Sequence, residues 1–239
     1  MTSRQSSRWI AAVLAACALA SAPAPGAGQQ IRSPYRFLEQ TQAGGLFVGY
    51  LGTDRGRFDL GPGPGPLLGG RYGIRLSGPF TIEGEAAFLP TSRFVIGLDQ
   101  DTIAPDSIVS RPVRLGRESD QSLLLLLAGL RFNLTGPRTY RNLQPYLLAG
   151  GGAVIELSDE DRGTDLPSDA RFDFGTSFAG HLGGGVEWFA MRRLGLRLDG
   201  RLVFWEIDLP RAFQTEVPRA PDDEWVQHFY VSAGAAIHF

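Results

Sequence analysis

The sequence predicts an all-β chain that folds as a single eight-stranded antiparallel up-and-down transmembrane β-barrel, and three observations lead to this fold class. Residues 225–239 alternate between a mostly apolar face and a mixed face, which is the side-chain period of a strand with different surroundings on its two sides. After residue 28 no stretch approaches the roughly 20 apolar residues of a membrane-spanning helix. Short and long connections alternate between the predicted strands, as in membrane barrels.

The first 28 residues of the chain have the pattern of a targeting segment. Residues 1–28 hold early arginines, an apolar run from Trp9 to Ala20, and then small residues and prolines, which is the layout of a secretory signal peptide. A lipoprotein signal is the alternative, with Cys17, the only cysteine of the chain, as the lipidated residue. Ordinary cleavage leaves a mature chain without cysteine, and therefore without a disulfide or a Cys-based metal site.

Residues 29–43 lack a clear period, and we expect a periplasmic N-terminal segment there; a plug that enters the lumen is the alternative. The barrel is expected over residues 44–239. Alternation and turn signals place its strands at 44–53, 67–77, 80–90, 121–134, 143–157, 173–188, 194–208 and 225–239. Apolar residues within the long second loop, 91–120, leave a ten-stranded barrel as an alternative.

Three strands, 67–77, 80–90 and 194–208, place their charged side chains on one face and their apolar side chains on the other. A charge that faces lipid at the membrane midplane costs about 2–4 kcal/mol, so this sorting indicates a lumen on the charged side. Strands 44–53 and 143–157 do not sort cleanly. Aromatic residues near the strand ends predict two interfacial girdles, with Phe80, Phe132, Tyr146, Trp188 and Phe239 near the short turns and Tyr50, Phe88, Phe174, Phe204 and Trp225 near the long loops.

The inward-facing charges predict a network inside the lumen. Its candidate members are Arg71, Arg75, Glu83, Glu85, Arg131, Glu187, Arg197, Asp199 and Arg201. The turn at Gly78 predicts that Arg75 lies opposite Glu83 on the neighbouring strand. Buried charges persist when they are paired, and eight strands leave a lumen that side chains can fill. A polar core is therefore expected, with a gated ion path or a ligand site as the alternative.

Catalytic chemistry finds little support in the sequence. All 23 basic residues are arginine, which excludes Lys general bases, Schiff-base chemistry and P-loop phosphate binding. His228 and Ser232 point to the same side of their strand, but about 13 Å of strand separates them. The net charge of −2 argues against a nucleic-acid partner. We therefore expect no catalytic residues, no metal site and no cofactor.

The C-terminal Phe239, preceded by alternating apolar residues, resembles the closing strand of bacterial outer-membrane β-barrels. The mature chain is similar in architecture to the small barrels of the OmpA transmembrane-domain, OmpX and OmpW type. This resemblance implies a monomer in the bacterial outer membrane with both termini in the periplasm, contact with lipid and lipopolysaccharide, and assembly through machinery that reads Phe239.

For function, the resemblance implies envelope structure, surface interaction or limited passage of small solutes, without enzyme activity. Two alternatives from other classes remain at this point. A lipid-modifying enzyme needs His, Ser and carboxylate side chains within hydrogen-bond reach of one another. A secreted lipocalin-like carrier needs an apolar interior and a polar exterior.

Overall fold

The computed structural model describes residues 33–104, 107–158, 172, 174–217 and 223–239. The chain divides into two units, Met1–Ser33 and Pro34–Phe239. The predicted signal peptide therefore lies outside the described residues, and every described strand belongs to the second unit. No helix among the described residues is long and apolar enough to cross a membrane.

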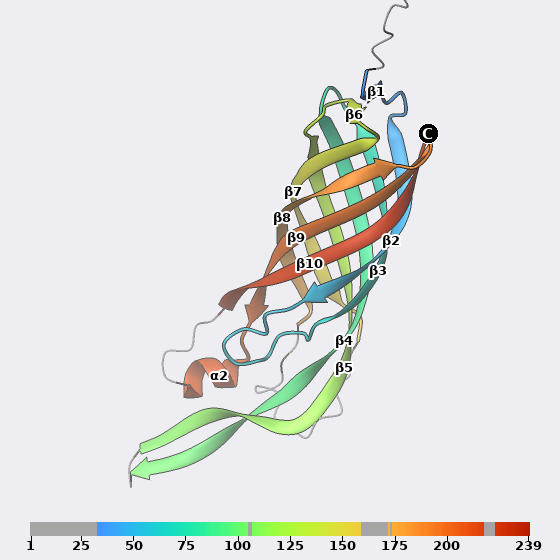
Figure 1. The fold of residues 1–239 in the computed structure, drawn as a ribbon. Coiled ribbons are helices and arrows are strands. Elements are labelled where there is room, and N and C mark those ends of the chain that lie inside the picture. The colour runs from blue at the N-terminus through green and yellow to red at the C-terminus, as the bar shows by residue number, and fades with distance from the viewer. Residues whose placement is uncertain (1–32, 105–106, 159–171, 173, 218–222) are drawn as a thin grey trace, which may run out of the picture. The chain divides into compact units, whose positions relative to one another are not determined.

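Ten strands and a short helix are described in the second unit. In chain order they are β1 (Tyr35–Phe37), β2 (Gln42–Gly52), β3 (Gly65–Arg75), β4 (Phe80–Ala104), β5 (Ser107–Asn133), β6 (Arg138–Tyr140), β7 (Leu143–Glu156), β8 (Thr176–Phe189), β9 (Leu194–Asp208), α2 (Arg211–Glu216) and β10 (Asp223–His238). Eight of these described strands, all except β1 and β6, pair antiparallel in the order β7-β5-β4-β3-β2-β10-β9-β8, and β7 pairs with β8 to close the barrel (Figure 1). The eight-stranded prediction is confirmed.

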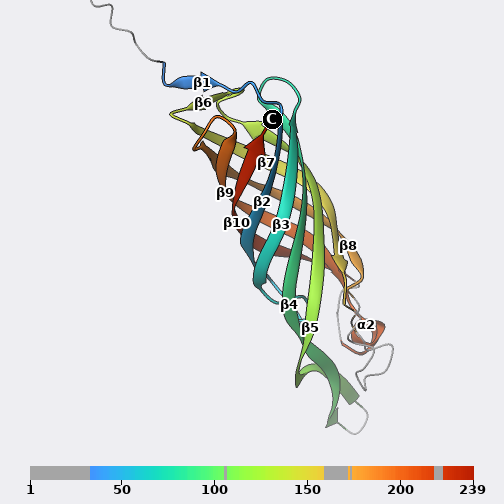
Figure 2. The same cartoon turned by 90° about the vertical axis from the view of Figure 1, so that its right-hand side faces the viewer.

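The two ends of the barrel differ. Short connections join β3 to β4 and β8 to β9 at one end, which we call the turn end (Figure 2). The backbones of Gln42 and Phe239 exchange hydrogen bonds of 3.1 and 2.9 Å there, so the barrel begins and finishes at this end. The opposite end, called the loop end, carries the connections from β2 to β3, from β4 to β5, from β7 to β8 and from β9 to β10.

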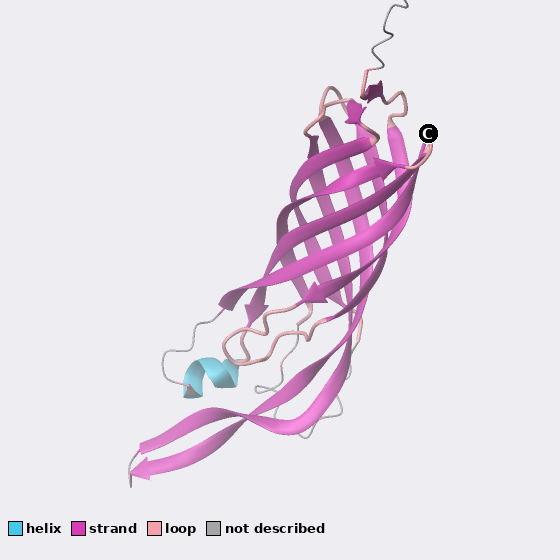
Figure 3. Cartoon of the chain, viewed as in Figure 1, coloured by secondary structure: helices cyan, strands magenta, loops and turns pink. Residues whose placement is uncertain are grey.

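The predicted long second loop is instead a two-stranded ribbon. Beyond Leu89 of β4 and before Leu123 of β5, the two strands pair in the sheet only with each other. We call residues 90–104 and 107–122 the ribbon; Figure 3 shows it projecting beyond the other strands at the loop end. Because it does not insert into the barrel wall, the ten-stranded alternative is wrong.

The facing of the side chains follows the predicted alternation. Leu68, Ile82 and Leu198 are exposed on the outside, while Arg71 and Glu83 are buried inside. Of the two strands whose facing the sequence leaves open, β2 also sorts: Leu46 is 73% exposed, whereas Phe47 and Leu51 are buried. Apolar side chains therefore cover the outside of the barrel, and we call this surface the outer belt.

The predicted girdle position is wrong for two of the aromatic residues. Tyr146 is 1% exposed and Phe174 is 7% exposed, because both side chains turn toward the interior. The other predicted members that are clearly exposed are Phe80, Phe132, Trp188 and Phe239 at the turn end and Tyr50, Phe88 and Trp225 at the loop end.

The predicted pairing across the β3–β4 turn is also wrong. Arg75 lies opposite Thr81, and Glu83 lies opposite Gly73. The amide of Leu76 donates to the carbonyl of Phe80 at 3.0 Å, so the turn occupies Ser77 to Pro79. Gly78 has a φ of 57° in this turn, a backbone conformation that glycine adopts without steric cost. The shift moves the partner by two positions, which preserves the facing of every side chain.

Residues 34–41, which precede β2, form an ordered segment at the turn end that we call the strap. β1 pairs with β6, and the amide of Leu38 donates to the carbonyl of Pro137 at 3.0 Å. Leu38 is buried, and its carbonyl accepts a 2.7 Å hydrogen bond from Nη1 of Arg75. The described part of the predicted N-terminal segment is thus tied to the barrel rather than an unpaired tail.

Candidate functional site: the filled lumen

The turn-end half of the lumen holds a layer of paired charges. Nη2 of Arg197 donates to Oε1 of Glu83 at 2.8 Å, and Nη1 of Arg197 donates to the second carboxylate oxygen. Nη2 of Arg131 donates to Oε2 of Glu187 at 2.7 Å. Each of these four side chains is almost fully buried. The Arg197–Glu83 pair is bidentate. Buried charges are stable when they are paired and hydrogen-bonded in this way.

A second group of the layer lies one step closer to the loop end. Asp199 accepts from Nη1 of Arg71 at 2.8 Å and from Nε of Arg201 at 2.8 Å. Nη2 of Arg201 also donates to Oε2 of Glu85 at 2.8 Å. Four arginines and four carboxylates are therefore matched within hydrogen-bond distance, and eight of the nine predicted residues belong to this charged layer.

Arg75, the ninth predicted residue, is placed differently. It is half-buried at the turn end, and its only hydrogen bond among the described residues goes to the carbonyl of Leu38. No described carboxylate lies within ion-pair distance of its guanidinium group.

Neutral side chains complete the charged layer. The hydroxyl of Tyr230 donates to Oε1 of Glu85 at 2.9 Å, and the hydroxyl of Ser232 donates to Oδ2 of Asp199 at 3.0 Å. Tyr146 accepts from Nε of Arg197 at 2.5 Å, and a ring nitrogen of His238 lies 2.7 Å from Oε1 of Glu187. These residues were not predicted as members of the network, although the inward parity of Tyr230, Ser232 and His238 in β10 is a signal that could have found them.

Glycines on the wall make room for these large side chains. Gly183 lies opposite Arg201, and Gly185 lies opposite Asp199. A Cβ atom added at Gly185 would lie 2.5 Å from the hydroxyl of Tyr146 and 2.7 Å from Cβ of Asp199. The run of three glycines in β8 is therefore a sequence signal for crowding in the lumen at this level.

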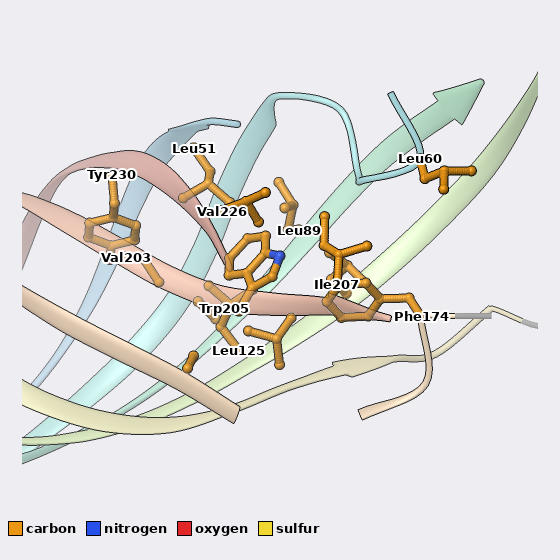
Figure 4. Close-up of a cluster of buried hydrophobic side chains, with 14 of the residues drawn as sticks. Leu51, Leu60, Leu89, Leu125, Phe174, Val203, Trp205, Ile207, Val226 and Tyr230 are labelled. Atoms are coloured by element: carbon orange, nitrogen blue, oxygen red, sulfur yellow. The ribbon is translucent and has the colours of Figure 1, made fainter. Parts of the chain in front are cut away.

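The loop-end half of the lumen is apolar, a feature that was not predicted from the sequence. Figure 4 shows Trp205 surrounded by Leu51, Leu89 and Leu125, all of them fully buried. His228 stacks on Trp205 with ring centroids 3.5 Å apart, and its Nδ1 accepts from the amide of Asp54 at 3.2 Å. We call this group the apolar layer.

Loop residues continue the apolar layer past the barrel rim. Leu60, in the connection from β2 to β3, and Phe213, in α2, are buried in the same cluster. The ring centroids of Phe58 and Phe213 lie 5.9 Å apart. Ile96, at the base of the ribbon, is buried there as well. We call this folded assembly the loop-end cap. The lumen is thus filled from its charged layer through its apolar layer to the cap.

A cavity remains at the turn end. It has a volume of about 40 Å³ and is lined by charged-layer residues together with Arg75 and residues of the strap, among them Gln40 and Thr41. About 10–15 Å³ is needed for one water molecule, so the cavity has room for a few.

The three histidines do not form a catalytic arrangement with the residues described. Ser232 is bonded to Arg71 and Asp199, while His228 lies in the apolar layer. His181 is buried in the lumen, with Nε2 at 3.4 Å from the carbonyl oxygen of Ala128. Within the described part of the chain, no group of His, Cys, Asp and Glu side chains is arranged to hold a metal ion. The connection from β7 to β8 contains five acidic residues, Asp159, Glu160, Asp161, Asp165 and Asp169, which lie outside the described residues.

No family model and no curated protein sequence matches the chain. Solved structures do match. Neisserial surface protein A matches with 15% identity, over 87% of this chain and 98% of that chain, at a TM-score of 0.49. The outer membrane protein OprG from Pseudomonas aeruginosa matches with 14% identity, over 84% of this chain and 96% of that chain, at a TM-score of 0.44. Ail of Yersinia pestis matches with 12% identity, over 84% and 97% of the two chains, at a TM-score of 0.39.

At such identities a likeness concerns the fold alone, and the chain's own geometry carries the assignment. Eight antiparallel strands close a barrel whose charges lie inside and whose apolar side chains lie outside. Short turns gather at one end and long connections at the other. By its architecture, the chain is a small up-and-down β-barrel of the outer-membrane type.

Proposed function

We propose that this protein is an integral protein of the bacterial outer membrane with a closed lumen, and that it serves to hold the loop-end cap and the ribbon at the cell surface. The distribution of polarity is the observation that carries the proposal. Leu198 is 59% exposed on the outside, whereas Arg197 and Asp199 on either side of it are buried inside. Such an inside-out arrangement is stable where lipid, rather than water, surrounds the barrel.

The filled lumen favours a surface role over solute passage. A solute entering from the turn end meets the paired charges first and then the apolar layer around Trp205. The loop-end cap covers the far side of that layer. A conducting path through these layers requires several packed side chains to move together, so a resting barrel of this kind passes no ions.

The proposed partners follow from an orientation in which the loop end faces the cell surface and the turn end faces the periplasm. The outer belt contacts lipid, the loop end meets the lipopolysaccharide leaflet, and both chain ends lie in the periplasm. Phe239 is exposed at the end of β10, where assembly machinery has access to it. A secreted lipocalin-like carrier is disfavoured because its interior would be apolar throughout, and a lipid-modifying enzyme is disfavoured because His228 and Ser232 have separate partners.

The experiment compares two leucine-to-arginine variants during refolding into lipid vesicles. Leu198→Arg puts a charge on the outer belt at a cost of about 2–4 kcal/mol if the site lies near the midplane, and we expect it to prevent insertion. Leu115→Arg is the matched control, because Leu115 is 49% exposed but lies on the ribbon, outside the barrel wall. Protease protection and the heat-dependent gel shift measure insertion. Equal insertion of both variants would contradict a membrane role.

Electrical recording tests the closed lumen separately. Inserted native protein in a planar bilayer should give no discrete conductance steps. Glu83→Ala should also remain silent, because the apolar layer lies in series with the charged layer. Regular steps from the native protein would refute the closed lumen while leaving the membrane location untouched.

A further inference from the structure

The turn-end half of the lumen contains one guanidinium group more than the carboxylates of the charged layer can neutralise. Arg71, Arg131, Arg197 and Arg201 share four buried carboxylates. Arg75 is the fifth arginine, and a backbone carbonyl is its only hydrogen-bond acceptor among the described residues. Charge in a partly buried site needs a counter-charge, and a neutral carbonyl supplies only partial compensation.

Two donors that have no acceptor in the described part of the chain belong to side chains that line the cavity at the turn end. Nε of Arg75 and Nε of Arg71 are both buried and both lack a hydrogen-bond partner among the described residues. Arg71 is more than nine-tenths buried, and both side chains line the cavity at the turn end. A buried N–H group without an acceptor is destabilising, so an acceptor held in this cavity would stabilise the fold.

The charges that line the cavity give the sign of that acceptor. Arg71, Arg75, Arg131 and Arg197 line it, against the two carboxylates of Glu83 and Glu187. Arg131 and Arg197 are paired with these two carboxylates, and Arg71 is paired with Asp199 and Glu85, so Arg75 carries the unbalanced charge. The field at the remaining space is therefore positive. Water can satisfy the two N–H groups there, but it cannot balance the charge.

We propose that the turn-end cavity binds a small monovalent anion of halide size, such as chloride, beside the guanidinium group of Arg75. A volume of about 40 Å³ accommodates a monatomic ion with a little water and excludes large organic anions. The strap forms one wall of the cavity through Gln40 and Thr41, and the carbonyl of Leu38 holds the Arg75 side chain in position. The anion thus links the strap to the charged layer.

Chloride-dependent stability tests the proposal. The refolded mature chain is unfolded with urea in detergent micelles, in sodium chloride or in sodium gluconate of equal ionic strength. An ion that binds only the folded state multiplies the folding equilibrium constant by 1 + [L]/Kd, about tenfold at a chloride concentration ten times the dissociation constant. We expect this gain for the native protein, its loss in Arg75→Gln, and its retention in Arg75→Lys, which keeps the charge.

Arg138→Gln is the matched control, because Arg138 is an exposed arginine at the same end of the barrel. It should retain the full chloride response. Equal stability of the native protein in chloride and gluconate would overturn the proposal, and so would an unchanged chloride response in Arg75→Gln. If Arg75→Gln fails to fold, anomalous diffraction from native crystals soaked in bromide decides: a peak in the cavity beside Arg75 supports the site, and a cavity without one refutes it. The test is independent of the proposed membrane function because it uses detergent-solubilised protein.

Discussion

Replacing Glu83 by glutamine removes one negative charge from the middle of the charged layer. Glu83 accepts two hydrogen bonds from Arg197 and lies 4.0 Å from Arg131 and 3.9 Å from Arg201. The glutamine amide retains one acceptor oxygen but turns an NH2 group toward the guanidinium groups. Arg197 is then left buried with an incomplete set of acceptors.

The expected loss follows from these contacts. Hydrogen bonds to charged groups contribute about 1.5–3 kcal/mol each, so the lost bond and the repulsion that replaces it amount to a few kcal/mol. Breaking a buried ion pair by removing one partner typically costs about 3–5 kcal/mol. We expect Glu83→Gln to lower the free energy of unfolding by about that amount, measured by urea unfolding in lipid vesicles.

Two further variants distinguish lost pairing from general damage. Glu39→Gln is the control, because Glu39 is exposed in the strap and its substitution should change the stability by less than about 1 kcal/mol. The double variant Glu83→Gln with Arg197→Gln removes both charges and should recover much of the loss. A loss below about 1 kcal/mol for Glu83→Gln, or simple addition of the two single losses in the double variant, would refute the reasoning.

Two more predictions concern the loop end. Trp205→Ala removes the largest side chain of the apolar layer and should cost about 3–5 kcal/mol in urea unfolding, whereas Trp225→Ala, at an exposed position on the same sheet, should cost much less. Replacement of residues 99–111 by Asn-Gly should shorten the ribbon without loss of the barrel, because the described residues of this stretch pair only within the ribbon. The heat-dependent gel shift should be unchanged in the shortened protein, and its disappearance would mean that the ribbon stabilises the barrel wall.

Local pattern was enough to predict the barrel wall. The period of two in 67–77, 80–90, 194–208 and 225–239 indicated both the strands and their facing, because the side-chain direction alternates with each residue whatever the strand pairs with. Where glycine and alanine interrupt the pattern, as in β7, the sequence does not indicate the facing, and the structure buries Tyr146 inside the barrel rather than in a girdle. Gly78 predicts the turn, but the register of β3 against β4 depends on which residues of the turn bond to each other.

The sequence by itself determined which charges enter the lumen, but not how they pair. Glu83 and Arg197 are 114 positions apart, and they meet because they project from opposite walls of a closed barrel. The tilt and stagger of the strands set which levels face each other across the lumen, and no local pattern encodes these quantities. Tertiary structure therefore decided the partners of each charge, the division of the lumen into a charged layer and an apolar layer, and the isolation of Arg75 at the turn end.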